Sequence, residues 1–168
     1  MKILVAYYSR TGTTKAVGEY LAKELGADID EIVDLKERLG PVNYIRAARD
    51  AKGLNATEIR CEKNPVDYDV IVIGTPIWRN SLPPAPHTYL SSHSLKGKKV
   101  AFFITSASED REFVFKQMKQ RAADSEIIGT CGILQKVVKN GNISDQLAGI
   151  IKTLKAESVS NSQVHLVE

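Results

Sequence analysis

Near its amino terminus the chain reads Ile3-Leu4-Val5-Ala6-Tyr7-Tyr8-Ser9-Arg10-Thr11-Gly12-Thr13-Thr14. The apolar run over 3–8 is rich in β-branched and aromatic residues, which predicts a strand that is buried on both faces. Apolar residues then recur at three- and four-residue spacing from Ala16 to Leu25, and Gly26 supplies a stop signal, so an amphipathic helix is predicted there. A buried strand, a polar loop and a helix in this order indicate a βαβ unit.

The rest of the chain repeats this alternation. Apolar runs predict further strands over 70–73, 100–104 and 127–134, with a weaker one over 29–33, and helical spacing recurs over 113–122 and 143–154. Strands that alternate with helices predict a three-layer, doubly wound α/β fold with a five-stranded parallel sheet. We expect one domain over 1–156, a long connection over 35–67 with a short helix over 43–52, and a loosely held polar tail over 157–168.

Composition excludes several classes of protein. The chain has 168 residues, of which 43% are hydrophobic and 26% charged, values that disordered, collagen-like and disulfide-rich chains do not have. The net charge of +3 is too small to indicate a nucleic-acid partner. The two cysteines, Cys61 and Cys131, form no CxxC pair, so we predict no metal site.

The lengths of the apolar runs indicate where in the cell the protein resides. No apolar run approaches the roughly 20 residues that span a bilayer, and the run over 3–8 is too short for a signal peptide. We therefore expect a cytoplasmic protein without integral membrane contact.

The loop after the first strand has the character of a phosphate site. Four of its six residues carry hydroxyl groups, Gly12 allows a tight turn, and the amides at the start of the following helix carry a positive partial charge. The pattern is neither GxxxxGK[ST] nor GxGxxG, so a single terminal phosphate suits it better than a triphosphate. The alternative is that these hydroxyls merely cap the helix. The candidate residues are Ser9, Arg10, Thr11, Gly12, Thr13 and Thr14.

Two more loops follow predicted strands, and the carboxyl ends of parallel strands meet at one edge of a sheet. The loop over 74–81 contains Trp78, the only tryptophan of the chain, whose ring is suited to stack on a flat ligand. In the loop after 104, Ser106 and Glu109 have the S-x-x-E spacing of a helix capping box. The candidate residues in these loops are Thr75, Pro76, Ile77, Trp78, Arg79, Asn80, Thr105, Ser106 and Ala107.

These motifs together resemble the flavodoxin family. The segment 8–14 is similar to the family's S/T-x-T-G-x-T loop, which binds the phosphate of flavin mononucleotide (FMN), and the segments 68–78 and 102–106 are similar to its third and fourth strands with their loops. The resemblance extends from Met1 to about Thr153. It implies the strand order 2-1-3-4-5, FMN as the cofactor, and contacts to FMN from the candidate residues of all three loops.

The resemblance implies a protein that carries electrons between redox partners. An alternative is an FMN-dependent reductase that uses NAD(P)H to reduce a quinone or a similar small molecule. It is favoured by a third loop without an aromatic residue and by one arginine in each loop (Arg10, Arg79 and Arg111). A flavodoxin-like porphyrinogen oxidase is a further alternative, if the basic residues Arg38, Arg46, Arg49 and Lys52 bind substrate carboxylates. A binding module without flavin is the least favoured class, and the oligomeric state stays open.

Overall fold

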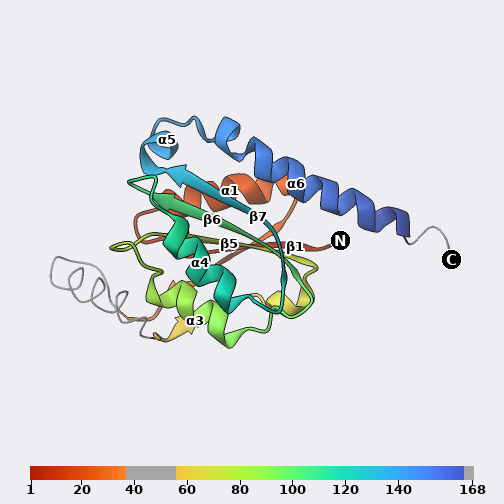
Figure 1. Cartoon of the computed structure of the whole chain (residues 1–168), viewed down its shortest axis with the longest axis horizontal. Coiled ribbons are helices and arrows are strands. Elements are labelled where there is room, and N and C mark those ends of the chain that lie inside the picture. Colours follow the sequence, from red (N-terminus) through yellow and green to blue (C-terminus); the bar gives the residue numbers. More distant parts are fainter. Residues whose placement is uncertain (37–55, 165–168) are drawn as a thin grey trace.

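The fold is a parallel sheet between two layers of helices (Figure 1). The computed structural model describes residues 1–36 and 56–164, with side chains over 1–36 and 56–157. The helix that we predicted over 43–52 lies outside the described residues, as do Arg38, Arg46, Arg49 and Lys52.

The predicted α/β class and strand order are confirmed. The strands of the main sheet are β1 (Ile3–Tyr7), β2 (Asp28–Glu31), β5 (Val70–Pro76), β6 (Lys99–Ser106) and β7 (Glu126–Leu134). Their spatial order is β2-β1-β5-β6-β7, and every neighbouring pair is parallel. Numbered within this sheet alone, the order is 2-1-3-4-5.

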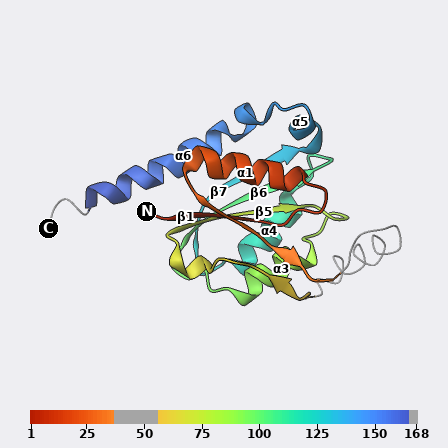
Figure 2. The same cartoon turned by 180° about the vertical axis from the view of Figure 1, so that it is seen from behind.

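Two helices cover each face of the sheet. The helices α1 (Thr13–Leu25) and α6 (Ile143–Val164) cover one face, and α3 (Pro84–Ser92) and α4 (Glu112–Arg121) cover the other (Figures 1 and 2). Successive residues of each central strand alternate between the two resulting cores. Both faces are therefore apolar, and for this reason the strands read as continuous hydrophobic runs.

The first helix ends where the sequence predicts, but it begins at Thr13, within the stretch that we predicted as a loop. Gly12 precedes it with a φ of 88°, and Gly26 ends it with a φ of 59°. The N–H of Gly26 donates to the carbonyl groups of Ala22 and Lys23, which is the usual way that a left-handed glycine satisfies the last turn of a helix.

A small antiparallel pair stands at the edge of the domain. The strands β3 (Val33–Asp34) and β4 (Ile59–Arg60) pair with each other, and the 3-10 turn η1 (Pro65–Asp67) follows. The buried carboxylate of Asp30 accepts hydrogen bonds from the backbone N–H groups of Glu62 and Lys63, at 3.1 and 3.0 Å. These bonds join the end of the long second connection to the edge strand β2.

The carboxyl-terminal segment differs from our prediction. A short helix, α5 (Gln135–Lys139), follows β7, and α6 then continues to Val164 instead of ending near 156. Glu157, at the start of the predicted loose tail, pairs with Lys99 of β6. Beyond the apolar stripe that packs α6 on the sheet, each added helical residue still gains a backbone hydrogen bond, so the helix extends past its core contacts.

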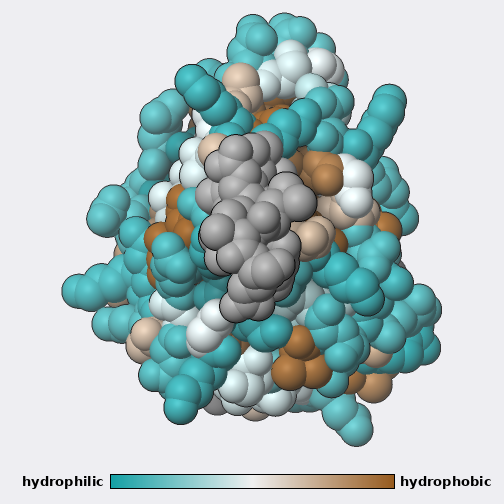
Figure 3. All heavy atoms as spheres, turned by 90° about the vertical axis from the view of Figure 1, so that its right-hand side faces the viewer, coloured by the Kyte–Doolittle hydropathy of each residue, from teal (hydrophilic) through white to brown (hydrophobic). Residues whose placement is uncertain are grey.

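The end of the molecule where the strands begin presents mostly hydrophilic side chains, with small hydrophobic areas between them (Figure 3). That composition suits a surface in contact with water. Within the described residues, no helix combines the length and the hydropathy needed to cross a bilayer. The candidate site lies at the other end, where the strands finish.

Candidate functional site

A cavity of about 470 Å³ opens where the carboxyl ends of β1, β5 and β6 meet. This is the edge at which ligands bind in doubly wound sheets. All three predicted loops contribute to its walls, together with α5. The lining residues are Arg10, Thr11, Thr13, Thr14, Pro76, Ile77, Trp78, Thr105, Gln135 and Lys139.

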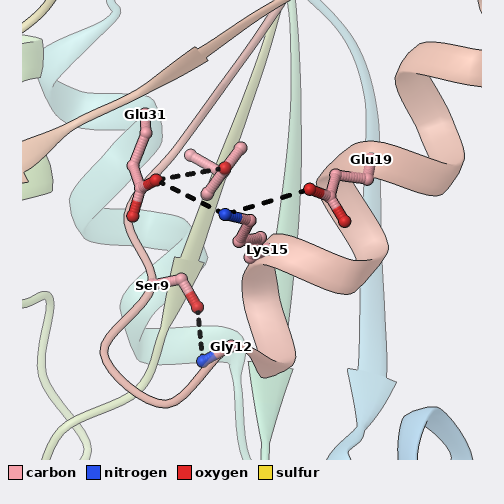
Figure 4. A network of polar contacts seen from close by, with 6 residues as sticks. Ser9, Gly12, Lys15, Glu19 and Glu31 are labelled. Carbon is pink, nitrogen blue, oxygen red and sulfur yellow. Dashed lines mark hydrogen bonds and ion pairs between the residues drawn. The ribbon is translucent and has the colours of Figure 1, made fainter.

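The first loop is held by its own side chains. The hydroxyl of Ser9 accepts a hydrogen bond from the backbone N–H of Gly12 at 3.1 Å, which closes a tight turn before α1 (Figure 4). The first N–H groups of α1, starting at Thr13, have no acceptor within the helix. Thr11 and Thr13 line the cavity beside them. The loop thus offers backbone donors and hydroxyl groups to an anion, as a phosphate requires.

Two hydrogen bonds join the three loops to one another. The hydroxyl groups of Thr14 and Thr105, both buried, lie 2.7 Å apart. The N–H of Ile77 donates to the carbonyl of Thr105 at 3.2 Å. Thr105 therefore ties the start of α1 and the loop after β5 to the end of β6, which makes the cavity walls a single unit.

The second loop contains a tight turn that presents Trp78. Arg79 and Asn80 have positive φ values of 47° and 58°. Trp78 and Ser81 exchange both backbone hydrogen bonds, at 3.1 and 2.9 Å. Two left-handed central residues between such a pair are typical of a type I′ turn, and asparagine adopts this conformation more easily than most residues. This turn fixes where the indole stands.

The indole of Trp78 is half-buried at the wall of the cavity. Its ring meets the buried ring of Tyr8 edge to face, with centroids 5.6 Å apart and an angle of 70°. The guanidinium carbon of Arg10 lies 5.8 Å from the indole centroid. Tyr8 thus supports the indole from the core, while Arg10 covers part of it from the first loop.

The predicted capping box in the third loop is wrong. The helix α4 begins only at Glu112, after Arg111, and has no side-chain cap. The Ser106 hydroxyl instead donates to the carbonyl of Ser108 and accepts from Nε of Arg111 at 2.7 Å. A β-carbon on Gly132 would lie 2.4 Å from Cδ of Arg111, so this side chain lies against the backbone of β7. Strand β6 runs on to Ser106, which places that residue too far from α4 to cap it.

The three arginines that the sequence places one in each loop do not form a continuous basic surface around the cavity. Arg10 lines the cavity, Arg79 is exposed on its turn, and Arg111 folds back on Ser106. Seven predicted site residues do not line the cavity: Ser9, Gly12, Thr75, Arg79, Asn80, Ser106 and Ala107. Most of them shape the loops. Thr75, for example, is fully buried, and its hydroxyl donates to the carbonyl of Pro76 at 2.9 Å.

Sequence reasoning missed three residues of the site. Tyr8 supports Trp78, and Gln135 and Lys139 line the cavity from α5. A signal for the last two was present, because they directly follow the fifth apolar run, whose carboxyl end reaches the same edge of the sheet as the others.

Lys15, which follows the first loop, does not line the cavity. Its ammonium group lies 4.0 Å from a carboxylate oxygen of Glu19 and 3.9 Å from one of Glu31, and Figure 4 shows it between these two carboxylates. The Tyr7 hydroxyl donates to the same Glu31 oxygen at 3.4 Å. This network joins α1 to the edge strand β2.

The two cysteines are free thiols. Burial raises the pKa of the Cys61 thiol to about 12, with a smaller contribution from the nearby Asp30 carboxylate. Burial likewise raises the pKa of the Cys131 thiol. Both therefore stay protonated at neutral pH and are poor nucleophiles.

The cavity fits FMN in size and chemistry. Its volume is within the range of about 300–1,000 Å³ that small-molecule sites occupy. Hydroxyl groups and helix amides lie at the first loop and an indole lies at the second, and among the described residues no carboxylate lines the walls. Thr11, Thr13 and the first backbone N–H groups of α1 would hold the phosphate, with Ser9 and Gly12 shaping the turn before them, and Ile77 and Trp78 would contact the ring.

Replacing Gly12 with alanine tests the first loop. A β-carbon at this position meets no atom within 4 Å, so the change acts only through the left-handed backbone, at a cost of about 1–2 kcal/mol. We expect weaker FMN binding, measured by quenching of flavin fluorescence.

Gly141→Ala is the matched control for that change. Gly141 also has a positive φ, of 75°, and open space around it, but it lies between α5 and α6 and not in the first loop. Its replacement should lower the free energy of unfolding by a similar amount and leave FMN binding unchanged. Equal binding by the two variants would contradict the role that we assign to the first loop.

Comparisons with known proteins agree with this geometry. No curated protein matches the chain. A flavoprotein of Lactobacillus acidophilus, crystallised with FMN, is 23% identical and superposes with a TM-score of 0.69, covering 83% of this chain and 97% of that one. A candidate flavoprotein of Bacteroides eggerthii is 27% identical with a TM-score of 0.70, covering 86% and 97%. An NADH:FMN oxidoreductase in its apo form is 16% identical with a TM-score of 0.63, covering 95% and 90%.

A family model also matches most of the chain. The family model described as flavodoxin matches residues 2–148, which include all five strands of the main sheet and every loop that lines the cavity. The resemblance seen in the loop motifs therefore holds over most of the chain, and this protein belongs to the flavodoxin family.

Proposed function

We propose that this protein binds FMN and carries electrons between redox partners. The observation that supports the proposal best is the composition of the cavity. It combines hydroxyl groups and helix amides at one loop with a supported indole at the next, and the L. acidophilus relative was crystallised with FMN. FMN supplies the redox chemistry of such a protein, and the chain supplies binding and orientation.

The protein's own residues bind FMN and cover its ring, and they do not themselves react. The first loop binds the phosphate, and Trp78 presents an aromatic face that Tyr8 keeps in place. Among the lining residues, none is a histidine, cysteine, tyrosine or carboxylic acid. Within the described part of the chain, the walls therefore lack the side chains that most often act as a general acid or base near neutral pH, which suits transfer of electrons better than proton-coupled catalysis by a side chain.

Purification of the whole chain tests cofactor binding directly. We expect a yellow protein that releases FMN, and not riboflavin, when it is denatured. The released flavin is identified by chromatography against standards. A colourless protein that also fails to bind added FMN would exclude the proposed function.

A reductase that uses NAD(P)H is the second candidate. The observation in its favour is that Ala107 and Ser108 after β6 are exposed and carry no ring, so this loop offers no second aromatic face. The likeness to the NADH:FMN oxidoreductase shows the fold alone, because it is only 16% identical. The oxidase alternative depends on basic residues outside the described part of the chain, and no observation favours it.

Anaerobic reduction separates the carrier from the reductase. The FMN-loaded protein is mixed with NADPH or NADH alone, and then with NADPH and a flavodoxin reductase, while the flavin absorbance is followed. For a carrier, we expect bleaching only when the reductase is present. Rapid bleaching by either nicotinamide alone would identify an enzyme.

A further inference from the structure

Positive charge reaches the cavity from an element outside the three predicted loops. The helix α5 follows β7 and lies beside the first turns of α1 in both views (Figures 1 and 2). Lys139, its last residue, lines the same cavity as Thr11 and Thr13. The phosphate end of the site thus contains a lysine that is far in sequence from the phosphate loop.

The other cations near this end are engaged elsewhere. Lys15 is shared between Glu19 and Glu31, and the guanidinium of Arg10 lies near the indole of Trp78. Lys139 forms no ion pair within 4.0 Å among the side chains described over 1–36 and 56–157. It adds a positive charge to the walls, and among the described residues that line them there is no carboxylate.

A lysine at the end of a helix also interacts favourably with the helix dipole, which is a purely structural explanation. Lys136 provides the comparison, because it too lies in the last turn of α5 and is exposed. Lys136, however, does not line the cavity. The interaction with the helix dipole therefore does not fully explain the position of Lys139.

We propose that Lys139 recognises the phosphate and lets the site distinguish FMN from riboflavin by charge. This inference rests on the proposed binding of FMN. A phosphate monoester carries a charge of about −1.5 to −2 at pH 7, whereas the hydroxyl groups and amides of the first loop are neutral. The flexible stem of a lysine can bring its ammonium group to such an anion, and hydrogen bonds between charged groups are stronger than those between neutral groups.

The test compares two lysines of one helix. Flavin is removed from the full chain, and FMN and riboflavin are titrated separately into the wild type, Lys139→Gln and Lys136→Gln. For Lys139→Gln we expect about five- to tenfold weaker FMN binding, the scale of one hydrogen bond to a charged group on an exposed side chain. Riboflavin binding should stay within about twofold, because riboflavin lacks the phosphate charge. Lys136→Gln should bind both flavins like the wild type, and Lys139→Arg should retain most of the FMN affinity.

Salt provides a measurement that depends less on any one variant. Raising the sodium chloride concentration should weaken FMN binding more steeply in the wild type and Lys136→Gln than in Lys139→Gln, because screening acts on exposed charge pairs. The inference is overturned if Lys139→Gln and Lys136→Gln bind FMN equally. It is also overturned if Lys139→Gln weakens riboflavin as much as FMN, since that indicates a structural role. Failure of the wild type to bind FMN at all refutes the proposed function instead.

Discussion

Replacing Gly74 with alanine is expected to lower the free energy of unfolding by about 3 kcal/mol, at the upper end of what overpacking a core usually costs. A β-carbon at this position would lie 1.9 Å from Cζ of Phe103, and 2.3 and 2.5 Å from two further ring carbons. Gly74 is in β5 and Phe103 is in β6, two strands that are paired at these residues. The ring is fully buried, so neither the backbone nor the ring has room to move away.

A double-mutant cycle shows whether the ring is the cause. Phe103→Ala alone should cost about 3–5 kcal/mol, because it leaves a large cavity. In that background, Gly74→Ala should add almost nothing, since the atoms it strikes are gone, and the coupling energy should be large. Urea unfolding followed by circular dichroism gives each of the four free energies.

Gly149→Ala is the matched control for the glycine change. Gly149 lies in α6, is exposed, and has no atom within 4 Å of an added β-carbon. Alanine there should stabilise the protein by about 0.5–1 kcal/mol, because it favours a helix more than glycine does. A Gly74→Ala protein as stable as the wild type would show that β5 and β6 pack less closely than the structure indicates.

Trp78→Ala is expected to weaken FMN binding by about 1–3 kcal/mol, the range measured for an aromatic side chain that stacks on a base. Among the residues that the structure describes, the indole is the only aromatic side chain that lines the cavity. It lies near the Tyr8 ring and the Arg10 guanidinium, and a tight turn fixes its backbone. The loss should be the same for riboflavin, because the contact involves the ring and not the phosphate. This pattern is the opposite of the one expected for Lys139→Gln.

Trp78→Phe is the control, since it keeps an aromatic face on the same turn and should retain part of the affinity. Both variants should unfold at nearly the same urea concentration as the wild type if the turn and Tyr8 keep their places. Unchanged flavin affinity in a well-folded Trp78→Ala protein would rule out the stacking role.

Much of the fold could be predicted because its signals are local. The run from Ile3 to Tyr7 is buried on both faces, so its apolar character shows in every residue. Gly12 and Gly26 stand at the two ends of α1, where the backbone needs a positive φ. The strand order was not local, and it came from the likeness of three loop motifs to a known family. The end of α6 was missed because helical hydrogen bonds continue where the apolar stripe stops.

The candidate site likewise has features that the sequence predicts and features that it does not. The sequence by itself determined that three polar loops follow buried strands, and since parallel strands end at one edge, those loops had to meet. Only the tertiary structure decided which side chains face the cavity. Thr14 and Thr105 are separated by 91 positions and form a hydrogen bond with each other. Ser106 forms a hydrogen bond with Arg111 instead of capping α4. Lys139 lines the cavity from α5, outside the three predicted loops. These contacts depend on how far each strand runs and how each loop turns, and spacing along the chain does not contain that information.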